Sequence, residues 1–400
     1  MAIELTNRTP FANLRFSNLD ARGREFGVLM VKQAFDIPKD GGACQLSDEQ
    51  EPFVLTDEYH GELNTSALRY PSDFVPFKPV TDVVLDATAF ATNGQARNWI
   101  VGVSVADSEG RSVERRLRVT GPRSWRSTWH AEPGEKADDQ ARERLFAGWA
   151  IDDPEPIDRL PIRYEYAFGG PVVVGIDDDG APIIDDDERN PIGRGRLPSG
   201  VPKPGVRVPA AQLLPVSAAP DDHEPGLVGF GPIPPAWLPR RPLGGTYDQR
   251  WMDEVWPRWA EDYDFRFHNS APEAMQADGF LRGNLDVRLE GLHPSLPSWS
   301  FELPVAPIVA SVLHEDGRSE QHAMQVDTVF LDVADPTADP RAFLVLRTAF
   351  DMFSAILIDV ERADSDGAAR TFVPEDVARI PPADDDGASE ERQANATENA

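Results

Sequence analysis

Residues 229–272, GFGPIPPAWLPRRPLGGTYDQRWMDEVWPRWAEDYDFRFHNSAP, form the stretch around which the chain is organised. Four of the nine tryptophans lie within it, and prolines and glycines separate them. Proline and glycine at this density prevent a long helix or strand, whereas aromatic rings bury large areas. The stretch therefore predicts an ordered, packed loop, but the residues alone do not say what it binds.

The composition around this stretch favours a β protein. A chain of 400 residues has the length of two or three average domains, or of fewer large β domains. A hydrophobic content of 40% is enough for a sizeable core. The 37 prolines argue against a helical protein and for short strands joined by turns.

The net charge of −29 disfavours binding to nucleic acid or to anionic membranes, because both repel an acidic surface. The acidity suits a basic protein partner, or it only keeps the chain soluble. The single cysteine, Cys44, excludes a disulfide framework and a multi-cysteine zinc site. Because no signal peptide and no run of about 18 apolar residues is visible, we expect a cytoplasmic protein without a membrane span.

Apolar or alternating runs predict strands on both sides of the tryptophan-rich stretch. The predicted strands cover residues 26–37, 81–91, 99–106, 113–120, 162–168, 281–292, 298–303, 308–314, 322–333, 343–348 and 356–361. Turn signals at 108–111 and 316–319 predict two hairpins. Good helix formers at 136–147 predict a short surface helix or an insertion.

We therefore predict a mainly β fold with antiparallel, β-sandwich-like sheets in one or two packed units, long ordered loops and few short helices. Residues 1–362 would form one domain, or two β units at about 1–170 and 226–362 bridged by a loop-rich segment at 171–225. Residues 363–400 are acidic and poor in apolar side chains, which predicts a disordered tail.

Signatures of catalysis or metal binding are scarce. The chain has no G-x-S-x-G elbow, no P-loop and no G-x-G-x-x-G after a strand, so we predict no catalytic residue and no cofactor. His314 and His322 flank a predicted hairpin but lack a third ligand, so we predict no metal site. The aspartates at 177–179 and 185–187 do not match EF-hand spacing and are read as turn residues.

A series of short motifs, taken in order along residues 1–350, resembles the domain of unknown function 2169 family, which is found in type VI secretion gene clusters. The motifs lie at 7–12, 34–37, 57–62, 72–83, 121–125, 164–170, 189–195, 230–232, 245–251, 262–264, 269–272, 327–328 and 347. Pro122 departs from the aspartate of the family pattern, an Asn-Glu pair expected before Phe230 is missing, and 131–150 resembles an insertion.

The resemblance implies an adaptor or chaperone that helps to load a toxic effector onto the VgrG spike, often through a PAAR tip domain, without catalysis. The expected partners are then a secreted effector and the PAAR-domain tip or VgrG; the oligomeric state is left open. Two alternatives remain. One is a hydrolase of carbohydrate or peptidoglycan that uses Glu165, Asp262 or Asp264 as paired carboxylates. The other is an immunity protein that neutralises an effector.

An exposed surface of aromatic and arginine side chains would supply the strongest contacts to a protein partner. The candidates are Trp237, Arg240, Arg241, Trp251, Trp256 and Trp259. Some of these must belong to the core, and alternation does not decide which in an irregular loop. A second set of motif residues is expected to determine backbone shape: Arg189, Asn190, Gly193, Phe230, Gly231, Pro232, Gly245, Thr246, Tyr247, Asp248, Asp264 and Asn269.

Overall fold

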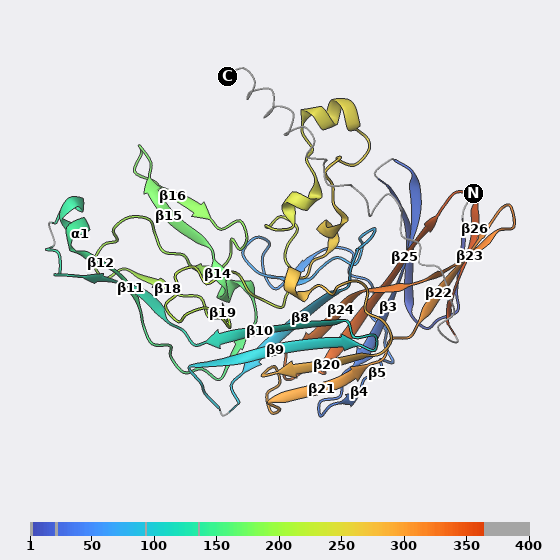
Figure 1. Ribbon diagram of the computed structural model, residues 1–400, viewed down its shortest axis with the longest axis horizontal. Coiled ribbons are helices and arrows are strands. Elements are labelled where there is room, and N and C mark those ends of the chain that lie inside the picture. The colour runs from blue at the N-terminus through green and yellow to red at the C-terminus, as the bar shows by residue number, and fades with distance from the viewer. Residues whose placement is uncertain (1–2, 21–22, 93, 135–136, 364–400) are drawn as a thin grey trace, which may run out of the picture.

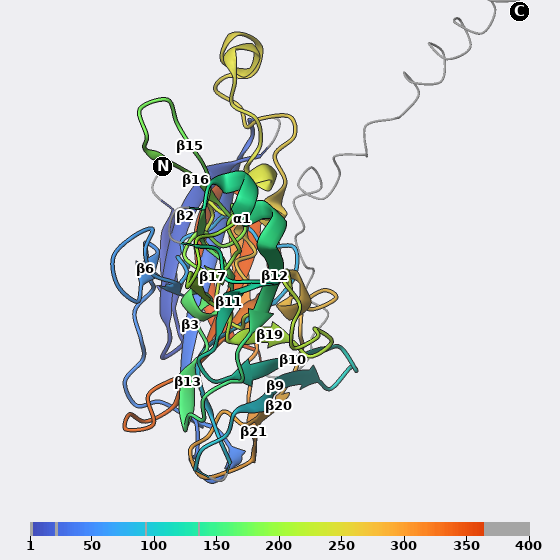
Figure 2. The ribbon, with the colours of Figure 1, turned by 90° about the vertical axis from the view of Figure 1, so that its left-hand side faces the viewer.

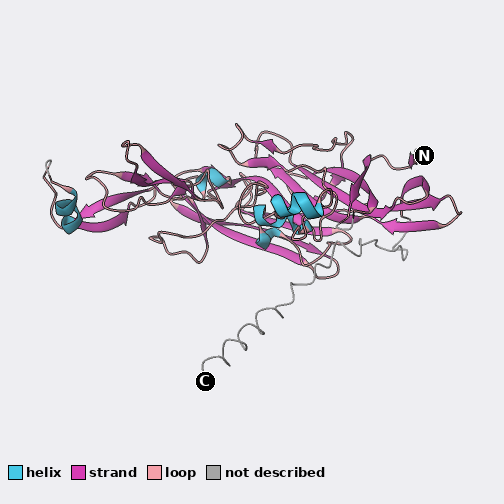
Figure 3. Cartoon of the chain, turned by 90° about the horizontal axis from the view of Figure 1, so that it is seen from above, coloured by secondary structure: helices cyan, strands magenta, loops and turns pink. Residues whose placement is uncertain are grey.

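Long apolar runs from distant parts of the chain pair with one another in two large sheets (Figure 1). The computed structural model describes residues 3–20, 23–92, 94–134 and 137–363, so all but the first residue of the predicted tail at 363–400 lies outside the described residues. Strands dominate, and the few helical turns lie at one end and near the centre (Figure 3). The prediction of a mainly β fold is confirmed.

The first large sheet is mixed and has the strand order β13-β8-β24-β25-β3-β2, with β5 paired to β3. Its strands are β2 (Ala12–Leu19), β3 (Glu25–Asp36), β5 (Gln45–Leu46), β8 (Asp82–Phe90), β13 (Arg159–Pro161), β24 (Gln325–Val333) and β25 (Arg341–Asp351). β8 and β24 run parallel, and the other pairs are antiparallel. All nine residues of β8 are buried, and six of them are apolar.

The second large sheet has the order β19-β10-β9-β20-β21-β4. Its strands are β4 (Gly42–Ala43), β9 (Asn98–Asp107), β10 (Ser112–Thr120), β19 (Leu213–Pro215), β20 (Leu285–Glu290) and β21 (Ser298–Leu303). β20 and β21 alternate buried and exposed residues, so one face of this sheet covers the core and the other meets solvent. One continuous hydrophobic core contains side chains from both large sheets, such as Leu85, Val103, Leu289 and Leu344.

Smaller elements surround these sheets. A four-stranded sheet contains β1 (Glu4–Asn7), β26 (Ala355–Arg362), β22 (Ile308–His314) and β23 (Ser319–Ala323), and a three-stranded sheet contains β12 (Phe146–Ile151), β11 (Ser124–Trp129) and β18 (Arg207–Pro209). Three strand pairs are β6 (Glu58–Tyr59) with β7 (Leu68–Tyr70), β14 (Phe168–Gly169) with β17 (Arg194–Gly195), and β15 (Pro171–Ile176) with β16 (Pro182–Asp186). The helical turns are α1 (Asp139–Leu145), η1 (Tyr164–Tyr166), η2 (Arg241–Gly244), η3 (Trp251–Val255), η4 (Phe265–His268) and η5 (Glu273–Met275).

The sheets do not follow the division into units at 1–170 and 226–362. In the first sheet, β24 and β25 lie between β8 and β3, and in the second sheet β20 lies beside β9. Strands from both stretches therefore share both sheets and one core, and these stretches are not two separate β units. Sequence order does not reveal this arrangement, because strand pairing here joins residues more than two hundred positions apart.

Two predicted elements differ in the structure. The predicted strand at 162–168 is replaced by the 3-10 turn η1 at Tyr164–Tyr166, and only Phe168 lies in a strand, β14. Nδ2 of Asn190 donates to the carbonyls of Tyr164 and Phe168 at 2.9 Å each and holds this turn. The predicted strand at 322–333 is divided at Met324 between β23 and β24, which belong to different sheets. The predicted surface helix is present as α1, where the Asp138 side chain accepts a hydrogen bond from the Ala141 amide at 2.8 Å.

Phe230 connects the tryptophan-rich stretch to the core. Its side chain is fully buried, and its carbonyl accepts a hydrogen bond from the Leu85 amide of β8 at 3.0 Å. The neighbouring Gly229 approaches Tyr164 so closely that a Cβ atom would lie 2.7 Å from the ring. The stretch is therefore packed against β8, as an ordered loop would be.

We expect Phe230→Ala to lower the free energy of unfolding by about 3–5 kcal/mol, because it leaves a cavity where the ring was buried. Denaturant-induced unfolding measures this loss. The matched control is Phe353→Ala, which removes a ring that is 83% exposed and should change stability by less than about 0.5 kcal/mol. Equal effects of the two substitutions would contradict the packing described for Phe230.

Candidate protein-binding site

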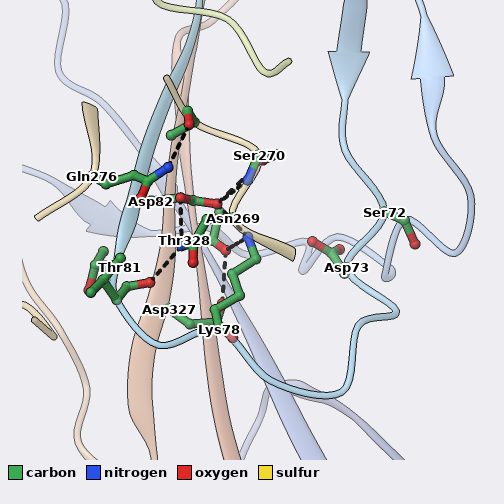
Figure 4. A network of polar contacts seen from close by, with 12 residues as sticks. Ser72, Asp73, Lys78, Thr81, Asp82, Asn269, Ser270, Gln276, Asp327 and Thr328 are labelled. Atoms are coloured by element: carbon green, nitrogen blue, oxygen red, sulfur yellow. Dashed lines mark hydrogen bonds and ion pairs between the residues drawn. The ribbon is translucent and has the colours of Figure 1, made fainter. Parts of the chain in front are cut away.

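A buried polar network joins the tryptophan-rich stretch to the first large sheet (Figure 4). Asp82, at the start of β8, is its centre. Oδ2 of Asp82 accepts hydrogen bonds from Nζ of Lys78 and from the Ser270 amide, each at 2.8 Å. Oδ1 accepts from Nδ2 of Asn269 at 2.8 Å. All four residues are at most 3% exposed, so this carboxylate is satisfied without water.

The network continues into β24 and β25. Lys78 also donates to Oγ1 of Thr328 at 2.8 Å, and the Thr328 hydroxyl donates to Oδ1 of Asp327 at 2.8 Å. Nε of Arg347 donates to Oδ2 of Asp327 at 2.5 Å, and Nη2 of Arg347 donates to the Asp73 carbonyl at 3.0 Å. Each of these side chains is paired within the protein, which indicates a structural role.

Charge is balanced inside this network. Lys32 donates to the Asp73 carboxylate at 2.9 Å, and both residues are less than 10% exposed. Three buried cations therefore face three buried carboxylates: Lys32, Lys78 and Arg347 with Asp73, Asp82 and Asp327. A charged side chain is stable in the interior only when it is paired and hydrogen-bonded. Removal of one partner therefore lowers the stability of the fold.

The motif at 189–195 also stabilises a particular backbone conformation. Nε and Nη2 of Arg189 donate to the two carboxylate oxygens of Asp187 at 2.9 and 2.8 Å. Asn190 is fully buried and bridges the turn η1 as described above. A Cβ atom on Gly193 would lie 2.8 Å from the Ala167 carbonyl oxygen, so this close approach of two backbones requires glycine.

Motif residues of the tryptophan-rich stretch attach it to η1 and join residues 246 and 262 within it. The Tyr164 hydroxyl donates to the Gly231 carbonyl at 2.8 Å beside the buried Pro232. The Thr246 amide and hydroxyl both donate to the Asp262 carboxylate, at 2.8 and 2.7 Å. Gly245 has a φ of +85°, a conformation that favours glycine.

Aspartates precede two of the three helical turns of this stretch. Oδ1 of Asp248 accepts a hydrogen bond from the Trp251 amide at 2.9 Å, ahead of η3. Asp264 accepts from the Arg266 amide and from the Arg266 guanidinium at 2.8 Å each, ahead of η4. Both are local side-chain to backbone contacts that determine where a turn begins.

Two predicted partner-binding residues are buried and must be reassigned to the core. Trp237 is 6% exposed, and its ring packs edge-on against Tyr164 with centroids 5.6 Å apart. Arg240 is 8% exposed and donates to the carbonyls of Ile233 and Phe267. Burial lowers the pKa of this guanidinium, but its contacts are backbone carbonyls inside the loop. Neither side chain is available to a partner.

The other predicted residues have a range of exposures. Arg241 is half-exposed and pairs with Glu188 at 2.8 Å. Trp259 is half-buried, with its ring centroid 4.0 Å from that of Tyr263. Trp251 is half-buried and donates from Nε1 to the Arg258 carbonyl at 2.9 Å. Trp256 is 63% exposed, the most exposed tryptophan of the stretch.

Residues 245–262 form a projection that we call the tryptophan arm. The arm extends beyond the sheets in Figure 1 and again in Figure 2. Its exposed apolar side chains are Tyr247 at 51%, Met252 at 57% and Trp256 at 63%. An exposed group of large apolar side chains on a projection is typical of a protein-interaction surface.

Sequence reasoning missed Tyr247 and Met252 as exposed residues. The sequence predicts a role in backbone shape for Tyr247, and Met252 lies in the turn η3 beside the half-buried Trp251. Neither strand nor helix periodicity covers an irregular arm, so no sequence signal separates its inner face from its outer face. The hydrogen bonds from Thr246 to Asp262 and the packing of Trp259 on Tyr263 orient these side chains.

The three carboxylates that the hydrolase alternative would use, Glu165, Asp262 and Asp264, all accept hydrogen bonds from neighbouring residues. Oε1 of Glu165 accepts a hydrogen bond from the Ala67 amide at 2.9 Å, and Asp262 and Asp264 make the contacts given above. Among the described residues, no group of three or more His, Cys, Asp and Glu side chains is placed to hold a metal ion. His314 and His322 lie in neighbouring strands and are both buried.

Comparison with known proteins places the chain in a family. The pattern of the family described as "Uncharacterized protein conserved in bacteria (DUF2169)" matches residues 22–347. The chain therefore belongs to this bacterial family, and the resemblance predicted from its motifs is confirmed. No curated protein and no solved structure matches the chain. No helix in the described part is long and apolar enough to cross a membrane.

We expect Asp327→Asn to lower the free energy of unfolding by about 3–5 kcal/mol, because it leaves the Arg347 guanidinium buried without its counter-charge. Urea denaturation followed by tryptophan fluorescence measures the change. The control is Asp359→Asn, which removes the partner of the mostly exposed Arg8 and should cost less than about 1 kcal/mol. A similar small loss in both variants would mean that the buried pair contributes little.

Stability should also fall in mild acid through His268, whose pKa burial lowers to about 3. Between pH 6.5 and about 4 the unfolded chain binds a proton at this imidazole and the folded chain does not, so acid favours unfolding. In His268→Gln the free energy of unfolding should fall less steeply between pH 6.5 and 4.5. The difference in slope should correspond to at most one proton taken up on unfolding. His130→Gln, at an exposed position, is the control. Parallel curves for wild type and His268→Gln would exclude this linkage.

Proposed function

We propose that this protein is a type VI secretion accessory protein: a cytoplasmic adaptor or chaperone that binds a toxic effector and helps to load it onto the VgrG/PAAR spike. The observation that carries the proposal is the tryptophan arm, which exposes Tyr247, Met252 and Trp256 above a base held by hydrogen bonds. The family resemblance described from the sequence points to the same role.

The arm suits binding because its backbone is already ordered. Thr246 and Asp262 join its two ends, and the half-buried Trp259 stacks with Phe265 at a centroid distance of 5.6 Å. A pre-ordered arm loses little conformational entropy when it binds, so more of the contact energy contributes to affinity. Large aromatic and methionine side chains are also enriched where interfaces are tightest.

Ion pairs along the arm leave the apolar side chains exposed between charged groups. Arg250 lies 3.3 Å from Glu254 and 3.3 Å from Glu261. Protein interfaces likewise combine apolar anchor residues with charged groups at their margin. The net charge of −29 adds long-range attraction for a basic client. The mechanism we propose is therefore binding and presentation, without chemical turnover.

We expect the double variant Met252→Ser, Trp256→Ala to bind the co-expressed effector encoded next to this gene at least tenfold more weakly than the wild type. Truncating exposed anchor residues removes interface contacts with little effect on the fold. Affinity purification with the effector, the PAAR protein and VgrG, together with a secretion assay, gives the readout. Phe353→Ala, on a different exposed ring, serves as the control.

Three outcomes separate the alternatives. Recovery of neither effector nor spike protein by the wild-type chain would overturn the adaptor proposal. An immunity protein would protect cells from the effector without changing its secretion. If the protein is a hydrolase, the Met252→Ser, Trp256→Ala variant should still cleave peptidoglycan. A variant in which Glu165 is replaced should no longer cleave it.

A further inference from the structure

The hairpin of β15 and β16 is a two-stranded sheet that stands apart from the rest of the fold. Neither strand pairs with a third strand among the described residues. The hairpin and the tryptophan arm project from the same side of the molecule in Figures 1 and 2. An isolated two-stranded sheet is marginal in water, and its open edges can pair with another chain.

Arg196 holds the base of the hairpin. Its Nη1 donates to the Asp185 carbonyl of β16 at 2.7 Å and to the Gly170 carbonyl, directly before β15, at 3.1 Å, and the guanidinium pairs with the Asp185 carboxylate. In the described part of the chain, no group from outside the hairpin donates to or accepts from the backbone of residues 172–176. β15 therefore presents an open edge.

Aliphatic side chains cover the hairpin although it lies in solvent. Val173 and Ile184 face each other across the strands and are 44% and 58% exposed. Val174, Ile176 and Ile183 are 39%, 71% and 46% exposed. β-Branched residues stabilise strands by packing against neighbours on the same face. Here these neighbours are missing on the β15 side, which points to a strand that is supplied by a partner.

The charge of the hairpin identifies the kind of partner. Residues 171–186 contain five aspartates and neither lysine nor arginine. Three of the aspartates, at 177–179, lie in the turn directly after β15. An added strand with basic side chains would neutralise this charge, whereas a second copy of the hairpin would bring ten carboxylates together. The observations therefore favour a basic segment over a second copy of this chain.

A groove of about 620 Å³ lies at the base of the hairpin. Val172 and Val174 of β15 line it together with Phe168 and Leu238. Its lining carries five carboxylates and two guanidinium groups: Asp185, Asp186, Asp187, Glu188 and Glu224 with Arg189 and Arg196. Neither Asp186 nor Glu224 forms an ion pair with another described residue. The groove thus offers apolar surface and unpaired carboxylates beside the open edge of β15.

We propose that the open edge of β15 binds an extended segment of the client protein in which apolar and basic side chains alternate, so that the segment becomes a third strand of the hairpin. Backbone hydrogen bonds along residues 172–176 give the affinity, and the aliphatic faces and aspartates select the side chains. The proposal rests on the proposed adaptor function, since it names the segment of a client that this site takes. The five aspartates also prevent two hairpins from pairing with each other.

The test uses a labelled ten-residue peptide that alternates valine with lysine, and the full-length chain. Two matched peptides are controls: one has glutamate in place of lysine, and one keeps the valine and lysine side chains but has N-methylated backbone amides. Fluorescence anisotropy should show binding of the first peptide at least tenfold tighter than either control, and the affinity should fall as salt rises. Hydrogen exchange should show new protection of the amides at 172–176.

Variants of the chain locate the contact. Val173→Ser with Ile176→Ser should weaken binding of the valine–lysine peptide at least tenfold. Asp178→Asn with Asp179→Asn should weaken it about three- to tenfold and reduce its salt dependence. Leu63→Ser is the matched control, because Leu63 is 62% exposed in the turn between β6 and β7, outside the hairpin, and it should change binding by less than about twofold.

Three results would overturn the proposal: equal binding of the N-methylated peptide, no effect of the hairpin variants, or a dimer of the chain that Val173→Ser with Ile176→Ser dissociates. The secretion assay separates this site from the adaptor function. If the wild type supports effector secretion but no peptide binds, only the strand-addition proposal fails. If the valine–lysine peptide binds as expected but the chain has no role in secretion, the adaptor proposal fails and the strand-binding site remains.

Discussion

The carboxylate of Asp82 is the contact on which the arrangement of this chain depends. It accepts hydrogen bonds from Lys78, Asn269 and Ser270 at 2.8 Å each, so it joins β8 to the end of the tryptophan-rich stretch. Through Lys78 and Thr328 the contacts continue to β24. A buried charge without partners is strongly destabilising, so a fold that buries Asp82 must bring these segments together.

This constraint connects stability with binding. Residues 229–272 enter the core at Phe230 and return to it at Asn269, and both ends are buried. The tryptophan arm between them can then expose Met252 and Trp256 without collapsing onto the sheets. A rigid support for a few exposed anchor residues is what a binding surface requires. The hairpin of β15 and β16 extends from the same side of the molecule, and there the exposed surface is a strand edge.

Strand positions could be predicted wherever local pattern and tertiary packing agree. The run at 26–37 is found as β3 and the run at 298–303 as β21, because continuous and alternating burial are both visible in sequence. The strand predicted at 162–168 failed because Asn190, more than twenty residues later, takes the carbonyls that a neighbouring strand would use. The sequence does not show that Trp237 and Arg240 turn inward, because an irregular loop has no periodicity that separates buried from exposed side chains.

By itself the sequence determined the mainly β class, the family and the loop character of residues 229–272, because composition, ordered motifs and the density of proline and glycine are local properties. Only the tertiary structure decided the interleaving of strands from both halves of the chain in two sheets, the burial of Arg240 and the exposure of Met252 and Trp256. These depend on contacts between residues far apart in sequence: the pairing of β8 with β24, the ring of Tyr164 against Trp237, and the charges around Asp82.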